Sequence, residues 1–321
     1  MLALVTGAAG FIGSHLSEKL VEQGHDVIGI DSFTSYYPRE RKLANLCSLR
    51  KSGRFTFIEG DIASLNLRRL MEGVDGVFHL AGQPGVRSSW GAGFSEYVHD
   101  NIIATQRLLE ASRERDILSR FVYASSSSVY GDSEELPLME QRIPRPNSPY
   151  GITKLAAEHL CQVYFRNFEV PTVVLRYFTV YGPRQRPDMA FNRFITRISK
   201  GLQIDIYGNG EQSRDFTFCD DIVSANLLAL RATPGNIFNV GASKPIKLSD
   251  AVELIERLVG KKAKIAYRPG AAGDVKNTYG DISKARREIG YSPRVTLQKG
   301  LESQVGWQLE SELESGVAVK A

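Results

Sequence analysis

The chain opens with MLALVTGAAGFIGSHL, residues 1–16, in which a short apolar run leads into glycines at every third position. The apolar run shows no alternation with polar residues, which is typical of a parallel strand buried on both faces. Gly7, Gly10 and Gly13 would let the backbone approach a pyrophosphate, which then sits at the N-terminus of the following helix. Strand, glycine turn and helix in this order predict a dinucleotide-binding unit, whereas the glycine spacing alone would also fit an ordinary turn.

An acidic residue ends the second expected strand. Residues 26–30 are largely apolar and are followed by Asp31, about 20 residues beyond the glycine turn, where an acid accepts hydrogen bonds from the adenosine ribose. The same charge would repel a 2′-phosphate. We therefore expect NAD rather than NADP, although a carboxylate here could also cap a turn.

Further strands alternate with helices along the first half of the chain. Strands are expected at residues 55–58, 74–80, 121–123 and 172–176, and the pattern loosens beyond about residue 180. This alternation predicts an α/β fold, a Rossmann-type doubly wound parallel sheet with a smaller C-terminal α/β domain. We expect residues 1–180 to form the NAD-binding domain, with a later segment of about 216–245 returning to it, and residues 181–321 to bind mainly substrate.

The loops after these strands supply further candidate cofactor contacts. Asp61 could bind the adenine amino group or simply form a turn, and the small residues Ala81 and Gly82 let a cofactor lie against the backbone. The residues expected to contact NAD are Gly7, Gly10, Phe11, Ile12, Gly13, Asp31, Asp61, Ile62, Leu80, Ala81, Gly82, Gln83, Asn101, Tyr150, Lys154 and Tyr177.

Two features of the centre of the chain predict chemistry. The strand at residues 121–123 is followed by four serines, Ser125 to Ser128, whose hydroxyls either cap local backbone or face a polar ligand. Tyr150 and Lys154 stand one turn apart on a helix expected to end near residue 168, so the ammonium could lower the pKa of the tyrosine toward neutrality. Most isolated pairs of this kind are accidental, but one that follows a nucleotide-binding half predicts a catalytic pair.

Composition narrows the class of protein. The chain has 321 residues, 42% of them hydrophobic, and a net charge of +4 without a long basic run, which fits a globular enzyme and argues against nucleic acid. Three scattered cysteines without a CxxC motif predict a reducing, cytoplasmic location and no metal site. No apolar run approaches the roughly 20 residues of a membrane span, so no membrane partner is expected.

The glycines, Asp31, the run 125–131, and Tyr150 with Lys154 together resemble the extended short-chain dehydrogenase/reductases. Residues 214–216 (Arg-Asp-Phe) and 273–275 (Gly-Asp-Val) also match family motifs, so the resemblance covers almost the whole chain.

Two stretches resemble one subgroup, the UDP-glucuronic acid 4-epimerases. They are PGVRSSWG at residues 84–91 and FTVYGPRQRPDMA at residues 178–190. UDP-galactose 4-epimerases usually have asparagine where this chain has Thr179, and sugar dehydratases have an Asp-Glu pair where it has Ser127 and Ser128.

The resemblance implies that NAD takes a hydride from carbon 4 of UDP-glucuronic acid and returns it to the opposite face, giving UDP-galacturonic acid. It assigns Tyr150 as the base, Ser126 as its hydrogen-bonding partner at the same oxygen, and Lys154 to the ribose. It also implies a homodimer through helices at about 101–116 and 150–168. Expected substrate contacts, with arginines from separate loops that could form a diphosphate pocket if they converge, are Arg87, Ser127, Ser128, Thr179, Arg186, Arg193, Arg214 and Asp274.

Three alternatives remain open at the level of sequence. The 4-keto intermediate is a β-keto acid, so a related enzyme could decarboxylate it to UDP-xylose. Thr179 with Ser127 and Ser128 could instead hold the carboxylate out of alignment with the carbonyl. The second alternative is a UDP-galactose 4-epimerase. The third is a non-catalytic NAD-binding sensor, against which Tyr150, Lys154 and Ser126 all speak.

Overall fold

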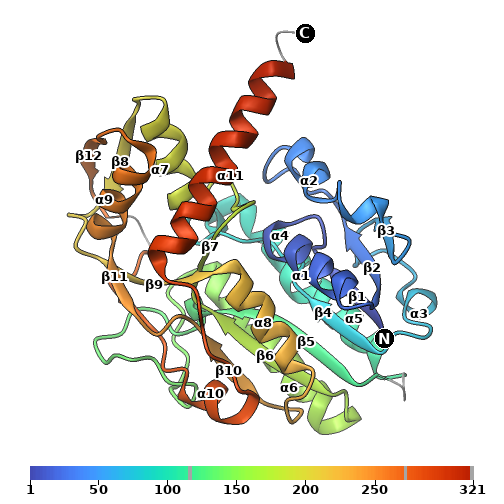
Figure 1. The fold of residues 1–321 in the computed structure, drawn as a ribbon. Helices are drawn as coiled ribbons and strands as arrows, with labels where there is room; N and C mark the ends of the chain where they lie inside the picture. The colour runs from blue at the N-terminus through green and yellow to red at the C-terminus, as the bar shows by residue number, and fades with distance from the viewer. Residues whose placement is uncertain (115–117, 271–272, 319–321) are drawn as a thin grey trace.

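The computed structural model describes residues 1–114, 118–270 and 273–318, and its largest element is a seven-stranded parallel sheet (Figure 1). The strand order is β10-β6-β5-β4-β1-β2-β3. The predicted doubly wound α/β sheet is therefore confirmed. Its strands are β1 (Leu2–Thr6), β2 (Asp26–Asp31), β3 (Phe55–Glu59), β4 (Gly76–His79), β5 (Arg120–Ser126), β6 (Thr172–Tyr177) and β10 (Ile237–Val240).

Helices cover both faces of this sheet, which is why its strands are apolar on both sides (Figure 1). One face packs against α1 and α8, and the other against α5 and α6. The helices of this part are α1 (Phe11–Glu22), α2 (Arg39–Asn45), α3 (Leu67–Leu70), α4 (Phe94–Tyr97), α5 (Ala104–Ser112), α6 (Pro149–Phe168) and α8 (Cys219–Ala229). Short turns are η1 (Leu49–Lys51), η2 (Arg87–Ser89), η3 (Gly91–Gly93), the π-helical η4 (Val98–Ile103) and η5 (Ser127–Val129).

Helix α6 begins and ends where its sequence dictates. The Ser148 hydroxyl accepts a hydrogen bond from the Gly151 amide at 3.1 Å, and Pro149 occupies the first turn, where its missing N–H costs nothing. Glu169 ends the helix in the left-handed conformation, with φ at 57°. The expected span, from residue 149 to about 168, is confirmed.

The second half of the chain forms smaller sheets beside the large one (Figure 1). One joins β7 (Thr179–Tyr181), β9 (Ser213–Phe218), β11 (Pro245–Lys247) and β13 (Asn277–Thr278), and the other pairs β8 (Gln203–Tyr207) with β12 (Lys264–Arg268). Its helices are α7 (Ala190–Ser199), α9 (Leu248–Val259), α10 (Ser283–Ile289) and α11 (Leu297–Ala318). Within the described ranges, no helix combines the length and the apolar character needed to cross a membrane.

The order of the strands fixes where a ligand can bind. The chain adds β2 and β3 on one side of β1 and then crosses to add β4, β5 and β6 on the other. The connections at the carboxyl end of β1 and β4 therefore leave in opposite directions and open a crevice, which is the usual ligand site of such sheets.

Asp215 on β9 joins three segments of the second half. Its buried carboxylate accepts hydrogen bonds from the Ala242 amide at 2.6 Å, the Ser243 amide at 3.0 Å and the Gly280 amide at 3.3 Å. These amides belong to the loop after β10 and the segment after β13. One side chain thus satisfies backbone donors that would otherwise be buried without a partner.

We predict that Asp215→Ala lowers the free energy of unfolding by about 3 kcal/mol, because it leaves buried amides unsatisfied. Urea denaturation measures this. The matched control is Asp205→Ala, which removes an ion pair with the exposed side chain of Arg268 and should leave the free energy nearly unchanged. Equal effects of the two substitutions would show that Asp215 does not hold these loops.

Candidate active site

An open pocket with about 1190 Å³ of empty space lies at the carboxyl ends of β1, β2, β4 and β5. Its walls contain every residue expected to contact the cofactor except Asn101. Those residues are Gly7, Gly10, Phe11, Ile12, Gly13, Asp31, Asp61, Ile62, Leu80, Ala81, Gly82, Gln83, Tyr150, Lys154 and Tyr177. The structure therefore brings together side chains that the sequence spreads over 170 residues, from Gly7 to Tyr177.

The glycine turn lines the pocket and leaves no room for a side chain at Gly7 or Gly13. Gly7 has φ at +70°, and a Cβ at Gly13 would lie 2.1 Å from the Gly7 carbonyl oxygen. Helix α1 starts directly after this turn without a side-chain cap. This is the kind of cradle that accepts a pyrophosphate against the backbone.

Asp31 caps the turn, which is one of the two roles that the sequence left open, and its contact with the ribose stays a prediction. Its carboxylate accepts hydrogen bonds from the Ala9 amide at 3.1 Å and the Phe33 amide at 2.9 Å, and it also lines the pocket. Burial raises the pKa of this carboxyl, against the two amide bonds and the charge of Lys42. The side chain is thus fixed in place at the wall of the pocket.

Asn101 stands behind the pocket wall. Its amide oxygen accepts a hydrogen bond from the Gln83 amide at 2.8 Å, and its amide nitrogen donates to the Gln83 carbonyl at 3.1 Å and the Thr153 hydroxyl at 2.9 Å. These bonds tie the loop after β4 to α6, and the contact of Asn101 with the cofactor stays a prediction.

Tyr150 and Lys154 both face the pocket from α6. Lys154 is 6% exposed, and burial lowers its pKa to about 8. Burial raises the pKa of Tyr150, while a hydrogen bond with Ser126 and the charge of Arg186 oppose that rise. The expected pKa near neutrality is therefore not found in this structure, and the cation that acts on the tyrosine is Arg186.

The four serines differ in their partners. The Ser125 hydroxyl donates to Glu158 at 2.5 Å. The Ser126 hydroxyl accepts from the Ser128 amide at 3.1 Å and donates to the Ser128 hydroxyl at 3.1 Å. Ser127 is half-buried, and its hydroxyl bonds to none of the residues that the structure describes. Ser126 pairs with Tyr177 across β5 and β6, so Thr179 leaves the same edge of the sheet two residues later.

Two of the four predicted arginines converge. Arg87 binds Asp274 at 2.7 Å and lies 3.8 Å from the centre of the Tyr207 ring. Arg214 donates to the Val275 carbonyl at 2.6 Å, and the charges of Asp274 and Arg87 both act on it. We call Arg87, Arg214 and Asp274 the arginine cluster.

The other two arginines have separate positions. Arg186 lines the pocket and pairs with Asp188 at 3.0 Å, and Arg193 is half-buried on α7. Several other pocket residues were not predicted, because most lie in the irregular loop after β2 and one, Lys42, lies on the short helix α2. These are Ser32, Thr34, Tyr36, Tyr37 and Lys42.

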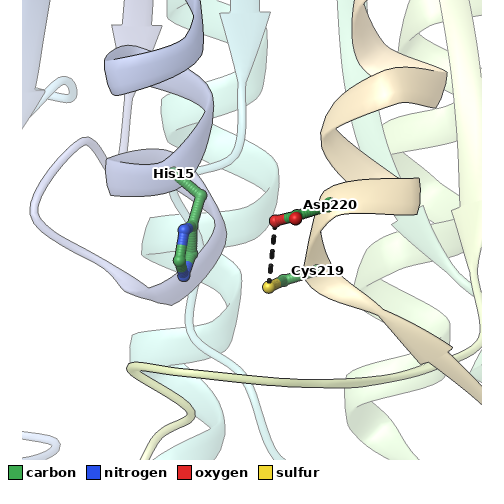
Figure 2. A group of neighbouring side chains, drawn as sticks. All are labelled: His15, Cys219 and Asp220. Atoms are coloured by element: carbon green, nitrogen blue, oxygen red, sulfur yellow. Dashed lines mark hydrogen bonds between the residues drawn. The ribbon is translucent and has the colours of Figure 1, made fainter. Parts of the chain in front are cut away.

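A second group of reactive side chains lies between α1 and α8 (Figure 2). His15, Cys219 and Asp220 are, among the described residues, the one set of three whose donor atoms lie close enough to hold a metal ion. The His15 ring already bonds the Pro183 carbonyl at 3.0 Å, and the Cys219 thiol donates to Asp220 at 3.6 Å. Burial raises the pKa of that thiol, so we assign the group a structural role.

Comparison with known proteins agrees with this geometry. An uncharacterized UDP-glucose epimerase of Bacillus subtilis is 47% identical, covering 96% of this chain and 98% of its own length. A UDP-glucuronate 4-epimerase of Thermodesulfobacterium geofontis is 38% identical, with 96% of each chain covered. The solved structure of UDP-glucuronic acid 4-epimerase from Bacillus cereus, in complex with UDP-glucuronic acid and NAD, is 44% identical with a TM-score of 0.94, and covers 97% of this chain and 100% of that one.

The resemblance seen in the sequence motifs is thus confirmed. Residues 3–241 match the NAD dependent epimerase/dehydratase family, and this chain belongs to that family.

Proposed function

We propose that this protein is a UDP-glucuronic acid 4-epimerase that interconverts UDP-glucuronic acid and UDP-galacturonic acid with bound NAD. The observation that carries the proposal is the pocket in which Tyr150 and Lys154 lie beside a dinucleotide cradle, with Ser126 hydrogen-bonded to Tyr150. It is supported by the Bacillus cereus enzyme, which shares 44% of its residues with this chain and was crystallised with UDP-glucuronic acid and NAD.

The residues present fit NAD. The backbone of Gly13 approaches Gly7 closely, with no side chain in between, so the pyrophosphate could lie against the backbone of this turn. Asp31 would accept hydrogen bonds from the adenosine ribose. Lys154 would hold the second ribose, with Asn101 supporting the loop from behind. When bound, NAD supplies the acceptor for the hydride on carbon 4 and gives it back.

The chain itself supplies proton transfer. Tyr150 would take the proton from the hydroxyl on carbon 4, and Ser126 would hydrogen-bond the same oxygen. Because burial raises the pKa of Tyr150, removal of its proton depends on nearby positive charge, which Arg186 supplies and Lys154 can add from one turn away.

The substrate would extend from this point into the second half of the molecule. Arg87 and Arg214 would bind the diphosphate, because guanidinium groups pair with phosphate oxygens, and Asp274 holds Arg87 in place until then. The neutral hydroxyls of Thr179, Ser127 and Ser128 would hold the sugar carboxylate, with Arg186 and Arg193 as further candidates. This arrangement would keep the carboxylate out of alignment with the 4-keto group and so suppress loss of carbon dioxide.

We also propose a cytoplasmic homodimer. Cys47, Cys161 and Cys219 are free, as expected in a reducing compartment. Exposed apolar side chains lie on α6 and on the neighbouring η4, including Ile152, Val163 and Ile103. A second copy would cover this surface. Sedimentation equilibrium should give twice the chain mass, and a monomer would exclude the dimer.

Incubation with UDP-glucuronic acid tests the function directly. We expect UDP-galacturonic acid by NMR, with no change in mass. A product that has lost carbon dioxide would identify a decarboxylase. Turnover of UDP-glucose alone would identify a UDP-galactose 4-epimerase, the second candidate, which the Bacillus subtilis relative's description favours. No turnover of either substrate would indicate a non-catalytic NAD-binding protein.

We predict that Tyr150→Phe lowers kcat by about 1000-fold, because the phenol is the proton acceptor, while NAD remains bound. Steady-state kinetics and cofactor content measured on the purified variant check both points. Tyr164→Phe is the matched control, since Tyr164 lies on the same helix and bonds Glu110 away from the pocket. Near-normal kcat in the Tyr150 variant would remove this residue from the reaction.

A further inference from the structure

The deepest charges beneath the pocket belong to Glu158 on α6 and Arg176 on β6. Their side chains are 2% and 3% exposed, and the guanidinium binds the carboxylate through two nitrogens, at 2.6 Å and 2.9 Å. Ser125 donates a third hydrogen bond to the same carboxylate at 2.5 Å. The carboxylate is thus paired with a cation and held by three hydrogen bonds.

Arg176 is itself held from the opposite side. Its remaining nitrogen donates to the Tyr130 hydroxyl at 2.9 Å, and Tyr130 donates in turn to Asn239 on β10 at 2.7 Å. The ion pair therefore cannot shift toward the pocket or away from it without breaking its hydrogen bonds to Ser125 and Tyr130. The negative charge of Glu158 has a fixed position.

Lys154 lies one helical turn from Glu158, on the side toward the pocket. The titratable groups around it are Tyr150, Glu158 and Cys161 on α6, Tyr123 on β5, whose ring centre is 4.5 Å from the ammonium, and His79 on β4. Burial lowers the pKa of His79 to about 3, so that ring is neutral. Glu158 is thus the anion in this set.

From this geometry we propose that Glu158, fixed by Arg176, is a positioning residue that keeps the positive charge on Lys154 for the ribose of the cofactor. The inference rests on the proposed NAD site. A protonated lysine can donate three hydrogen bonds, whereas burial without a nearby anion would favour the neutral amine. The Glu158–Arg176 ion pair therefore sets the pH range over which Lys154 is protonated and can bind the ribose.

The direction of the effect follows from the pKa of Lys154. Burial lowers it to about 8, and the charge of Glu158 opposes that fall. Removing the carboxylate charge should lower this pKa further, by about one unit, as for loss of an opposite charge close by. Lys154 would then lose its proton at a lower pH, and the alkaline weakening of NAD binding would begin about one pH unit earlier.

Glu158→Gln alone would leave Arg176 buried without a partner and could unfold the protein. The test therefore uses two variants without either charge, Glu158→Gln with Arg176→Met and Glu158→Gln with Arg176→Gln, together with Arg176→Lys, which keeps both charges. Circular dichroism selects the variants that fold. The first measurement is the pKa of Lys154 in cofactor-free protein, from the pH dependence of its acetylation by acetic anhydride, quantified by mass spectrometry.

The second measurement is the NAD dissociation constant between pH 6 and pH 10, by calorimetry. We expect both the pKa of Lys154 and the alkaline weakening of NAD binding to move down by about one unit in the charge-free variants, and to stay in place in Arg176→Lys. A folded charge-free variant with an unchanged pKa of Lys154 would overturn the proposal and leave Glu158 a purely structural role. Failure of wild-type protein to bind NAD would contradict the proposed cofactor site and, with it, the role of Lys154 at the ribose, whatever its pKa.

Discussion

The buried ion pair between Glu158 and Arg176 is the constraint on which the arrangement of the site depends. Two charges taken out of water are costly unless every donor and acceptor is used, and here Ser125 and Tyr130 complete the set. The bonds join α6 to β5, β6 and, through Asn239, β10. The helix that carries Tyr150 and Lys154 is thereby fixed against the carboxyl ends of the strands, where the cofactor cradle lies.

The site has two regions, one at the crevice of the large sheet and one that includes residues of the second half of the chain. The glycine turn and Asp31 lie at the crevice on one side of β1, and the reactive side chains of α6 face the same pocket. The arginine cluster joins Arg87, from the loop after β4, to Arg214 and Asp274 of the second half. A substrate bound by both parts would have its sugar at Tyr150 and its diphosphate at the cluster.

Much of this arrangement could be predicted from sequence, because short-range patterns carry it. The helix expected from Pro149 to about residue 168 is α6, and the glycine spacing predicted the cradle. The backbone bonds of Asn101 were not predicted, because an amide that binds backbone looks the same in sequence as one that binds a ligand. The pKa of Tyr150 was misjudged because spacing along a helix says nothing of burial, which dominates that pKa here.

Other features of the site cannot be predicted from any short stretch of sequence, because they depend on how distant elements pack. Glu158 and Arg176 meet only because α6 packs against β5 and β6. Tyr36 and Tyr37 reach the pocket from the loop after β2, and Lys42 reaches it from the short helix α2.

The most direct test of the account is a crystal structure of the protein with NAD and UDP-glucuronic acid. The account predicts the hydroxyl on carbon 4 within hydrogen-bond distance of Tyr150 and Ser126, Lys154 on the cofactor ribose, and the diphosphate between Arg87 and Arg214. A sugar whose carbon 4 lies away from Tyr150, or a diphosphate outside the arginine cluster, would contradict it.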